Sequence, residues 1–227
     1  MASTSITDTG NYVITMTVSD EFPSSMTSSF TLSVTNVAPK VVTVPDAVSL
    51  VHGKSLTIPL ASNFADDDGD GMTMKATYKL NGGSAVTIPN GIFSVPSSFT
   101  IDVKSTSFAD TGVYEITMIV SDDYPMSVTT SFTMSVTNVA PKVVTVPGDV
   151  SLVHGKSLTM PLASNFADDD GDAITMTCTY TKSGGAAVKI PNGIFSVPSP
   201  FTIDVKSTSF ADTGVYVITM IVSDGFP

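Results

Sequence analysis

An internal repeat of 102 residues constrains this chain more than any other feature of its sequence. Residues 41–125 align without a gap to residues 143–227, with 16 mismatches in 85 positions. The first forty residues fit the same frame, because Asp8-Thr9-Gly10 lies on Asp110-Thr111-Gly112 and Asn36-Val37-Ala38-Pro39 lies on Asn138-Val139-Ala140-Pro141. Self-similarity at a fixed period indicates one structural unit used repeatedly.

The repeat divides the chain into three segments. Residues 1–39 are predicted to be the C-terminal strands of a preceding repeat, residues 40–142 a complete repeat, and residues 143–227 the next repeat without its last strand. Because an isolated two-stranded hairpin is marginally stable at best, the first segment needs a partner. We favour the interpretation that this chain is one stretch of a longer array of such repeats. The alternative is donor-strand assembly, in which another copy supplies the missing strand.

Apolar and polar residues alternate with a period of two throughout the complete repeat, which is typical of half-buried strands. The pair Gly82-Gly83 is a hairpin signal between two such segments. Seven or eight short strands in about 100 residues, with Val41–Leu50 as one of them and no helical segment, predict an all-β fold of tandem immunoglobulin-like antiparallel sandwiches. The inward positions are Leu56, Ile58, Leu60, Met72, Met74, Ala76, Tyr78, Phe99, Ile101, Val103, Tyr114, Ile116, Met118, Val120, Phe132, Met134 and Val136.

Two residue types separate this sandwich from an antibody domain. The segment Asp110-Thr111-Gly112-Val113-Tyr114 is typical of a tyrosine corner, but Ile116 stands where an antibody domain has its second cysteine. The chain has no Trp, so the usual core tryptophan is absent as well. Cys178, the single cysteine, replaces the inward Ala76 of the other copy and is expected to be a buried, inert residue.

The order of these segments resembles the dystroglycan-type cadherin-like repeat and related immunoglobulin-like repeats of large surface proteins. The resemblance rests on the segments Phe64–Asp70, Asp110–Tyr114, Val120–Asp122 and Val136–Pro141, and it covers essentially the whole chain. It implies an extracellular tandem array, often stabilised by calcium and sometimes binding glycans.

The runs Asp66–Asp70 and Asp168–Asp172 are the only charge clusters in the sequence. Alternate aspartates in a loop present hard oxygen ligands at a spacing suited to calcium. The first run begins like an EF-hand, but Thr77 stands at the twelfth position where that loop requires a glutamate. The alternative interpretation is a solvated Asp-Gly turn.

Sandwich topology favours the metal interpretation, because the loop after the second strand and the loop between the last two strands cluster at one end. That end also receives the linker from the previous repeat, so we expect a calcium ion at each junction. The predicted ligands are Asp66, Asp68, Asp70 and Asp122 for one junction, and Asp168, Asp170, Asp172 and Asp224 for the next, with Asn36 and Asn138 as linker contributors.

Two other motifs are set aside. Gly53-Lys54-Ser55 lacks the earlier glycine of a P-loop, since Val48 occupies that position. His52 and His154 are one repeat position seen twice, at a strand end, and are expected to pack in a loop rather than to bind a ligand.

Composition excludes several classes of partner. A net charge of −11 with no arginine argues against nucleic acid and anionic membranes. No apolar run reaches the roughly 18 residues of a membrane span, and no signal peptide is evident in this segment. The 30 Ser and 31 Thr form hydroxyl ladders on strand exteriors, which β-propensity, O-linked glycans or lateral packing of arrays would explain.

The function we predict is structural: a segment of a long extracellular filament, stalk or surface spacer, with copies of itself or neighbouring repeats as partners. The alternative is an adhesion or carbohydrate-binding module of a cell-surface adhesin, whose sign would be exposed aromatics such as Tyr124 and Phe226. An enzyme is not expected, because no grouping of acid, base and nucleophile stands out.

Overall fold

A computed structural model describes residues 6–22, 24–124 and 126–226. Residues 1–5 of the predicted first segment therefore lie outside the described residues. The chain divides into two compact units: the first comprises residues up to 49, 55–104 and 112–135, and the second comprises 50–54, 105–111 and residues from 136 onward. Among the described residues, no helix is long and apolar enough to cross a membrane.

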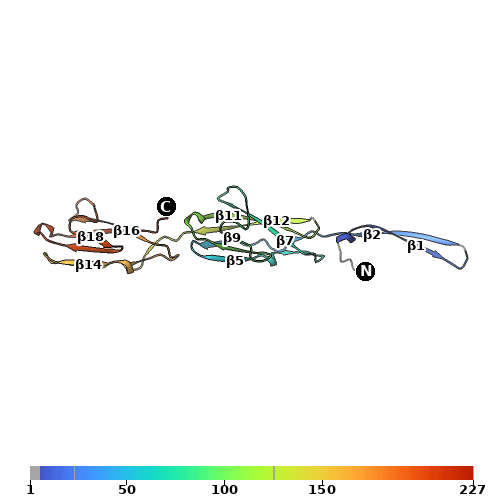
Figure 1. The fold of residues 1–227 in the computed structure, drawn as a ribbon, viewed down its shortest axis with the longest axis horizontal. Helices are drawn as coiled ribbons and strands as arrows, with labels where there is room; N and C mark the ends of the chain where they lie inside the picture. Colours follow the sequence, from blue (N-terminus) through green and yellow to red (C-terminus); the bar gives the residue numbers. More distant parts are fainter. Residues whose placement is uncertain (1–5, 23, 125, 227) are drawn as a thin grey trace. The chain divides into compact units, whose positions relative to one another are not determined.

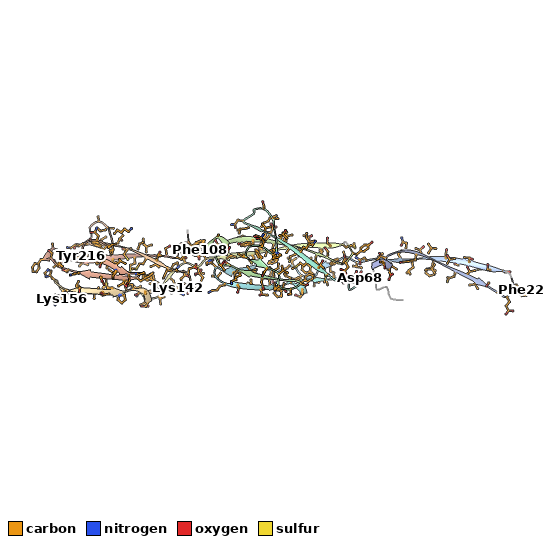
Figure 2. All side chains as sticks on the ribbon, viewed as in Figure 1. Phe22, Asp68, Phe108, Lys142, Lys156 and Tyr216 are labelled. Carbon is orange, nitrogen blue, oxygen red and sulfur yellow. The ribbon has the colours of Figure 1, made fainter. Side chains whose placement is uncertain are left out.

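The N-terminal part is a hairpin of strands β1 (Gly10–Ser19) and β2 (Ser25–Val34), preceded by the 3-10 turn η1 (Ile6–Asp8). The strands pair antiparallel over their whole length, with Gly10 opposite Val34. Both faces of the hairpin are largely exposed, and Phe22 at its tip projects away from the strands (Figure 2).

The complete repeat, residues 40–142, contains ten strands and two 3-10 turns in its described part. They are β3 (Lys40–Val41), β4 (Val48–Val51), β5 (Ser55–Pro59), η2 (Ala61–Asn63), β6 (Phe64–Ala65), β7 (Thr73–Leu80), β8 (Val86–Thr87), β9 (Phe93–Ser94), β10 (Thr100–Lys104), η3 (Phe108–Asp110), β11 (Gly112–Ser121) and β12 (Ser127–Thr137).

These strands form the two-layer arrangement predicted from the sequence. One sheet has the order β4-β12-β11-β7-β8 and the other the order β5-β10-β9, with β3 and β6 forming a short pair (Figure 1). Strand β11 pairs antiparallel with β7, and β10 pairs antiparallel with β5 and β9. The two orders correspond to the GFC and BED sheets of an immunoglobulin-type sandwich. The all-β fold class is thereby confirmed.

Most of the core lies where the alternation predicted it, although the predicted inward residues Leu56, Met72, Met74 and Tyr78 are only partly buried. On β11, Tyr114, Ile116, Met118 and Val120 are each at most 3% exposed, whereas Glu115 faces outward. Ala76 of β7 lies opposite Met118 and is buried too. The period of two in the sequence therefore corresponds to the alternation of side chains on the observed strands.

One strand prediction is wrong. The segment 41–50 was expected to be a single strand, but the structure divides it into β3 and β4, with Pro45 buried between them. Proline has no N–H to donate to a strand ladder, so it interrupts pairing there.

The following repeat, residues 143–227, has its described strands in the same chain order, beginning with β13 at the linker. They form the sheets β14-β19-β18, β17-β16-β20 and β13-β15. The elements are β13 (Lys142–Val143), β14 (Ser157–Pro161), η4 (Ala163–Asn165), β15 (Phe166–Ala167), β16 (Thr175–Lys182), β17 (Val188–Lys189), β18 (Phe195–Ser199), β19 (Thr202–Lys206), η5 (Phe210–Asp212) and β20 (Tyr216–Ser223).

The predicted burial of Cys178 is confirmed in this repeat, and the tyrosine corner predicted at Tyr114 is present at its counterpart Tyr216. Cys178 is buried in the core cluster beside residues such as Ile203 and Phe195. The hydroxyl of Tyr216 donates a 2.8 Å hydrogen bond to the carbonyl oxygen of Asp212, four residues upstream, which is the tyrosine-corner contact.

Candidate metal centre at the acidic loops

Each acidic loop is folded by its own first carboxylate. The Oδ1 atom of Asp66 accepts hydrogen bonds from the backbone N–H groups of Asp68 and Gly69, both at 3.2 Å. Gly69 has a φ of 86°, a left-handed conformation that favours glycine. This Asx-type turn holds the loop between β6 and β7, so that the later aspartates come to the end of the sandwich.

In the first unit the linker, residues 35–39 between β2 and β3, forms hydrogen bonds with these carboxylates. The backbone N–H of Val37 donates a 2.8 Å hydrogen bond to Oδ2 of Asp68. The side-chain amide of Asn36 donates a 2.9 Å hydrogen bond to Oδ2 of Asp122, which is buried after β11. Two loops distant in sequence are thus joined to one stretch of linker.

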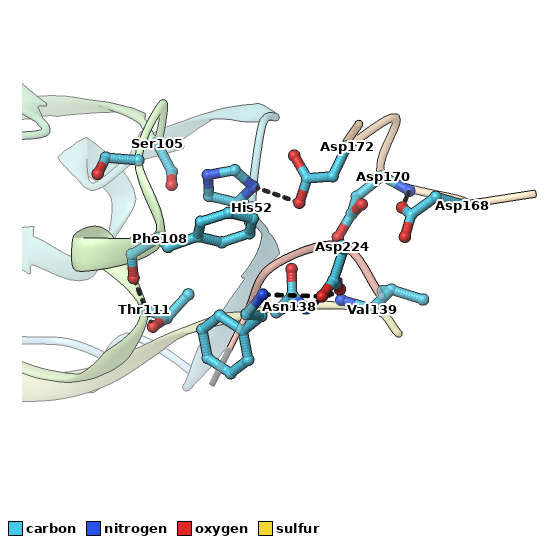
Figure 3. A network of polar contacts seen from close by, with 12 residues as sticks. His52, Ser105, Phe108, Thr111, Asn138, Val139, Asp168, Asp170, Asp172 and Asp224 are labelled. Atoms are coloured by element: carbon cyan, nitrogen blue, oxygen red, sulfur yellow. Dashed lines mark hydrogen bonds and ion pairs between the residues drawn. The ribbon is translucent and has the colours of Figure 1, made fainter. Parts of the chain in front are cut away.

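The second unit repeats this arrangement at the same sequence separations. The N–H of Val139 donates to Oδ2 of Asp170 at 2.9 Å, and the amide of Asn138 donates to Oδ2 of Asp224 at 2.7 Å (Figure 3). In both units the first contact spans 31 residues and the second spans 86.

The middle aspartate of each run has a different role from its neighbours. Lys40 forms an ion pair with Asp67, and Lys142 forms one with Asp169. Both carboxylates are more than half exposed, with a side-chain exposure of 57%. Each lysine therefore pairs with the middle aspartate of its run, and among the described residues no ion pair joins it to the other aspartates of that run.

Mutual proximity shifts the protonation of the first loop. The hydrogen bond between the carboxyl groups of Asp66 and Asp68 raises the pKa of Asp66 and lowers that of Asp68. Partial burial, together with the negative charges of Asp68, Asp122 and Asp123, raises the pKa of Asp70. The loop therefore concentrates negative charge that resists full ionisation.

The second loop has the same asymmetry. Burial, followed by the hydrogen bond with Asp170, raises the pKa of Asp168. Burial also acts to raise the pKa of Asp170, but hydrogen bonds from Asp168 and from the N–H of Val139 outweigh it and lower that pKa. The hydrogen bond from Asn138 is the main reason why the pKa of Asp224 is lowered.

Several ligand-type oxygens at these loops and at the linker are buried and, when the carboxylates are ionised, accept no hydrogen bond from the described residues. An unsatisfied buried polar atom ordinarily costs about 1–3 kcal/mol, so such atoms need a partner such as a water or an ion. Carboxylate and amide oxygens are the ligands that calcium prefers, and the donor set therefore fits that ion. The atoms are Asp66 Oδ2, Asp168 Oδ2, Asp170 Oδ1, Asp172 Oδ2 and Asn138 Oδ1.

The predicted ligands differ in what they contact. Asp68, Asp122, Asp170 and Asp224 bind the linker, whereas Asp66 and Asp168 accept hydrogen bonds from within their own loops. Both asparagines reach a carboxylate through the amide nitrogen rather than through the oxygen. Whether a metal binds these residues stays a prediction.

Sequence reasoning did not place His52 at this centre. Its Nδ1 atom lies 3.3 Å from Oδ2 of Asp172, and its ring stacks on Phe108 with 4.8 Å between centroids (Figure 3). The stacking agrees with the expected packing in a turn, but nothing in the pattern indicated a carboxylate 120 residues away. The recurrence of a histidine at this turn, as His154, was the only available signal.

Neither a family model nor a curated protein matches this chain. Among solved structures, it is similar to Sidekick-1 immunoglobulin domains 1–5, at 16% identity and a TM-score of 0.39 over 98% of this chain and 46% of that one. It is similar to domains 3–5 of Drosophila OTK at 17% identity and a TM-score of 0.32, covering 99% and 69%. The chain thus spans about half the length of the Sidekick-1 structure.

Proposed function

We propose that this chain is a structural segment of a tandem array, part of an extracellular filament, stalk or surface spacer. In this proposal each linker is clamped by the acidic loops of the repeat that follows it, and a calcium ion completes the clamp. The partners are then neighbouring repeats or copies of the same chain, and the role is to set length and stiffness.

The recurrence of the clamp is the observation that carries the proposal. A linker N–H and a linker asparagine bind loop carboxylates in both units, through contacts of equal sequence separation. A recognition site for one partner would need only one copy. A junction in an array needs the same contacts at every repeat, since every linker must be held in the same way.

Calcium is supported by the chemistry of the donors. The loop of the second unit offers buried oxygens of Asp168, Asp170 and Asp172 that have no hydrogen-bond partner among the described residues. Calcium takes 6–8 oxygen ligands and tolerates irregular geometry, and extracellular modules bind it with dissociation constants of roughly 10⁻⁴–10⁻³ M. A weak site of this kind suits a location outside the cell.

The adhesion alternative receives less support. Of its two exposed aromatics, Phe226 packs against Phe108 in the second unit, with 5.6 Å between ring centroids. Of the two named aromatics Tyr124 then remains, and Phe22 and Phe210 are exposed as well, at positions that lie on different turns.

Calorimetric melting of the 227-residue chain, with calcium and with a chelator, tests the proposal. Binding at about 100 times Kd should raise the free energy of unfolding by about 2.7 kcal/mol per site. The variant Asp170→Asn should lose the response of the second unit. The control Asp169→Asn removes an equal charge from the outer position and should keep it. Identical melting with calcium and with chelator would overturn the calcium clamp.

A further inference from the structure

The group formed by His52, Asp170 and Asp172 has a composition that calcium does not explain. One ligand atom from each residue lies within 4.8 Å of the other two, and this is the single such group of three among the described residues. Calcium binds oxygen, whereas an imidazole nitrogen with two carboxylates is a donor set for zinc and similar divalent ions. We propose that the second unit contains a zinc-class metal site made by these three side chains.

The histidine is buried and aimed at the acidic loop. Its side chain is only 7% exposed, and neither ring nitrogen has a hydrogen-bond partner among the described residues. Oδ1 of Asp170 and Oδ2 of Asp172 are likewise buried and without a hydrogen bond among the described residues, and the latter lies 3.3 Å from Nδ1 of His52. Three donor atoms that are buried together without hydrogen bonds are the arrangement that a bound cation resolves.

The spacing fits the smaller ion. Two ligand atoms that are each about 2.05 Å from a tetrahedral zinc ion lie about 3.3 Å apart. The separation of His52 Nδ1 and Asp172 Oδ2 is 3.3 Å. The remaining separations among the three ligand atoms are at most 4.8 Å.

The surrounding structure fixes the imidazole in this position. The backbone N–H of His52 donates a 2.8 Å hydrogen bond to the carbonyl oxygen of Thr137, which anchors the turn. The ring lies nearly parallel to that of Phe108, with 20° between the planes. A Cβ at Gly53 would lie 3.4 Å from the carbonyl oxygen of Asp170, so the turn and the acidic loop are in close contact. Orientation of a histidine ligand by its neighbours is a regular feature of metal sites.

This site shares Asp170 and Asp172 with the proposed calcium clamp but does not depend on calcium binding. The first unit provides a comparison, because its loop has no group of this kind among the described residues. Within these 227 residues, zinc is therefore expected at the acidic loop of the second unit, beside His52. The second histidine, His154, provides a control at the same repeat position.

Nuclear magnetic resonance of the imidazole groups tests the inference directly, because the chain contains only two histidines. Zinc added to the metal-free 227-residue chain should shift the ring resonances of His52 and leave those of His154 in place. Unchanged resonances, or equal shifts of both histidines, would overturn the proposal, the second result indicating adventitious binding.

Calorimetric titration with zinc gives the affinity. We expect one zinc ion per chain, and His52→Gln should weaken binding by more than the roughly 10–100-fold that loss of an outer-shell partner causes. His154→Gln should bind zinc as the unaltered chain does. Equal affinity of His52→Gln and the unaltered chain would contradict the assignment. The calcium response of His52→Gln should be unchanged, so failure of the calcium clamp and failure of the zinc site are separate outcomes.

Discussion

Strand β11 of the complete repeat and strand β20 of the following repeat have nearly the same sequence, with Glu115 replaced by Val217, but different surroundings. Met118 on β11 and Met220 on β20 occupy equivalent positions, yet Met118 is fully buried and Met220 is only partly buried. Strand β11 lies between β12 and β7 in a five-stranded sheet, whereas β20 is the last strand in the order β17-β16-β20. The burial of a residue thus depends on the strand beside its own as much as on its own alternation.

The turns at the ends of the two repeats differ in the same way. Phe108 contacts both His52 and Phe226, whereas Phe210 stacks on His154 and remains 80% exposed. The local sequence forms the histidine–phenylalanine stack in both places. Only the neighbouring loops decide whether the stack becomes part of a buried centre.

The largest difference in stability between the two repeats is expected when the equivalent methionines are replaced by alanine. Met118→Ala should cost about 2–5 kcal/mol in free energy of unfolding, because it leaves a cavity in a closed core. Met220→Ala should cost less than half of this, since the side chain is already partly exposed. Amide hydrogen exchange, followed for peptides of β11 and β20, reports each unit separately. Equal losses would show that the two environments are equivalent.

An intermediate effect is expected at the turns. Phe108→Ala removes the ring that contacts both His52 and Phe226, and should cost about 1–2 kcal/mol. Phe210→Ala, its matched control, should remain within about 0.5 kcal/mol, as exposed substitutions usually do. Chemical denaturation followed by tyrosine fluorescence measures both. A larger loss of unfolding free energy for Phe210→Ala than for Phe108→Ala would contradict the difference between the two turns.

The smallest effect concerns acid stability of the second unit. Backbone N–H groups of Ser209 and Thr208 donate to Asp212 and hold its pKa below the ordinary value of 3.8. A carboxylate with a lowered pKa stabilises the fold above pH 3.8, and this contribution is lost as the pH falls through the folded-state pKa.

Asp212→Asn should therefore be less stable than the unaltered chain near neutral pH, and the difference should vanish at the acid end. Asp149→Asn, which removes an exposed charge, serves as the control. Thermal melting as a function of pH measures the difference. A gap between Asp212→Asn and the unaltered chain that persists into acid would contradict this assignment.

The sandwich could be predicted from the sequence because strand alternation depends only on the pleat of the backbone. The inward set Tyr114, Ile116 and Met118 followed directly from it. The acidic loops were predicted to lie at the linker from sandwich topology alone, and contacts of Asp68 and Asp170 with the linker exist in both units.

The histidine could not be predicted, because alternation describes the faces of a strand and not what lies beyond its end. His52 meets Asp172 only after two separate turns have folded. The break at Pro45 was not predicted for a different reason. The valines on both sides of Pro45 have a strong β-propensity, and this favoured one continuous strand although proline has no N–H to donate.

The hydrogen bonds between a linker and the acidic loops also determine when that linker can become ordered during synthesis on the ribosome. Asn138 finds its carboxylate 86 residues later in the chain, at Asp224. At about 5–20 residues per second, that partner is made about 4–17 s after the linker itself. Strands β3 to β12 all precede Asn138 and can pair during this interval. The contact between Asn138 and Asp224 can therefore form only after almost a whole further repeat has been synthesised.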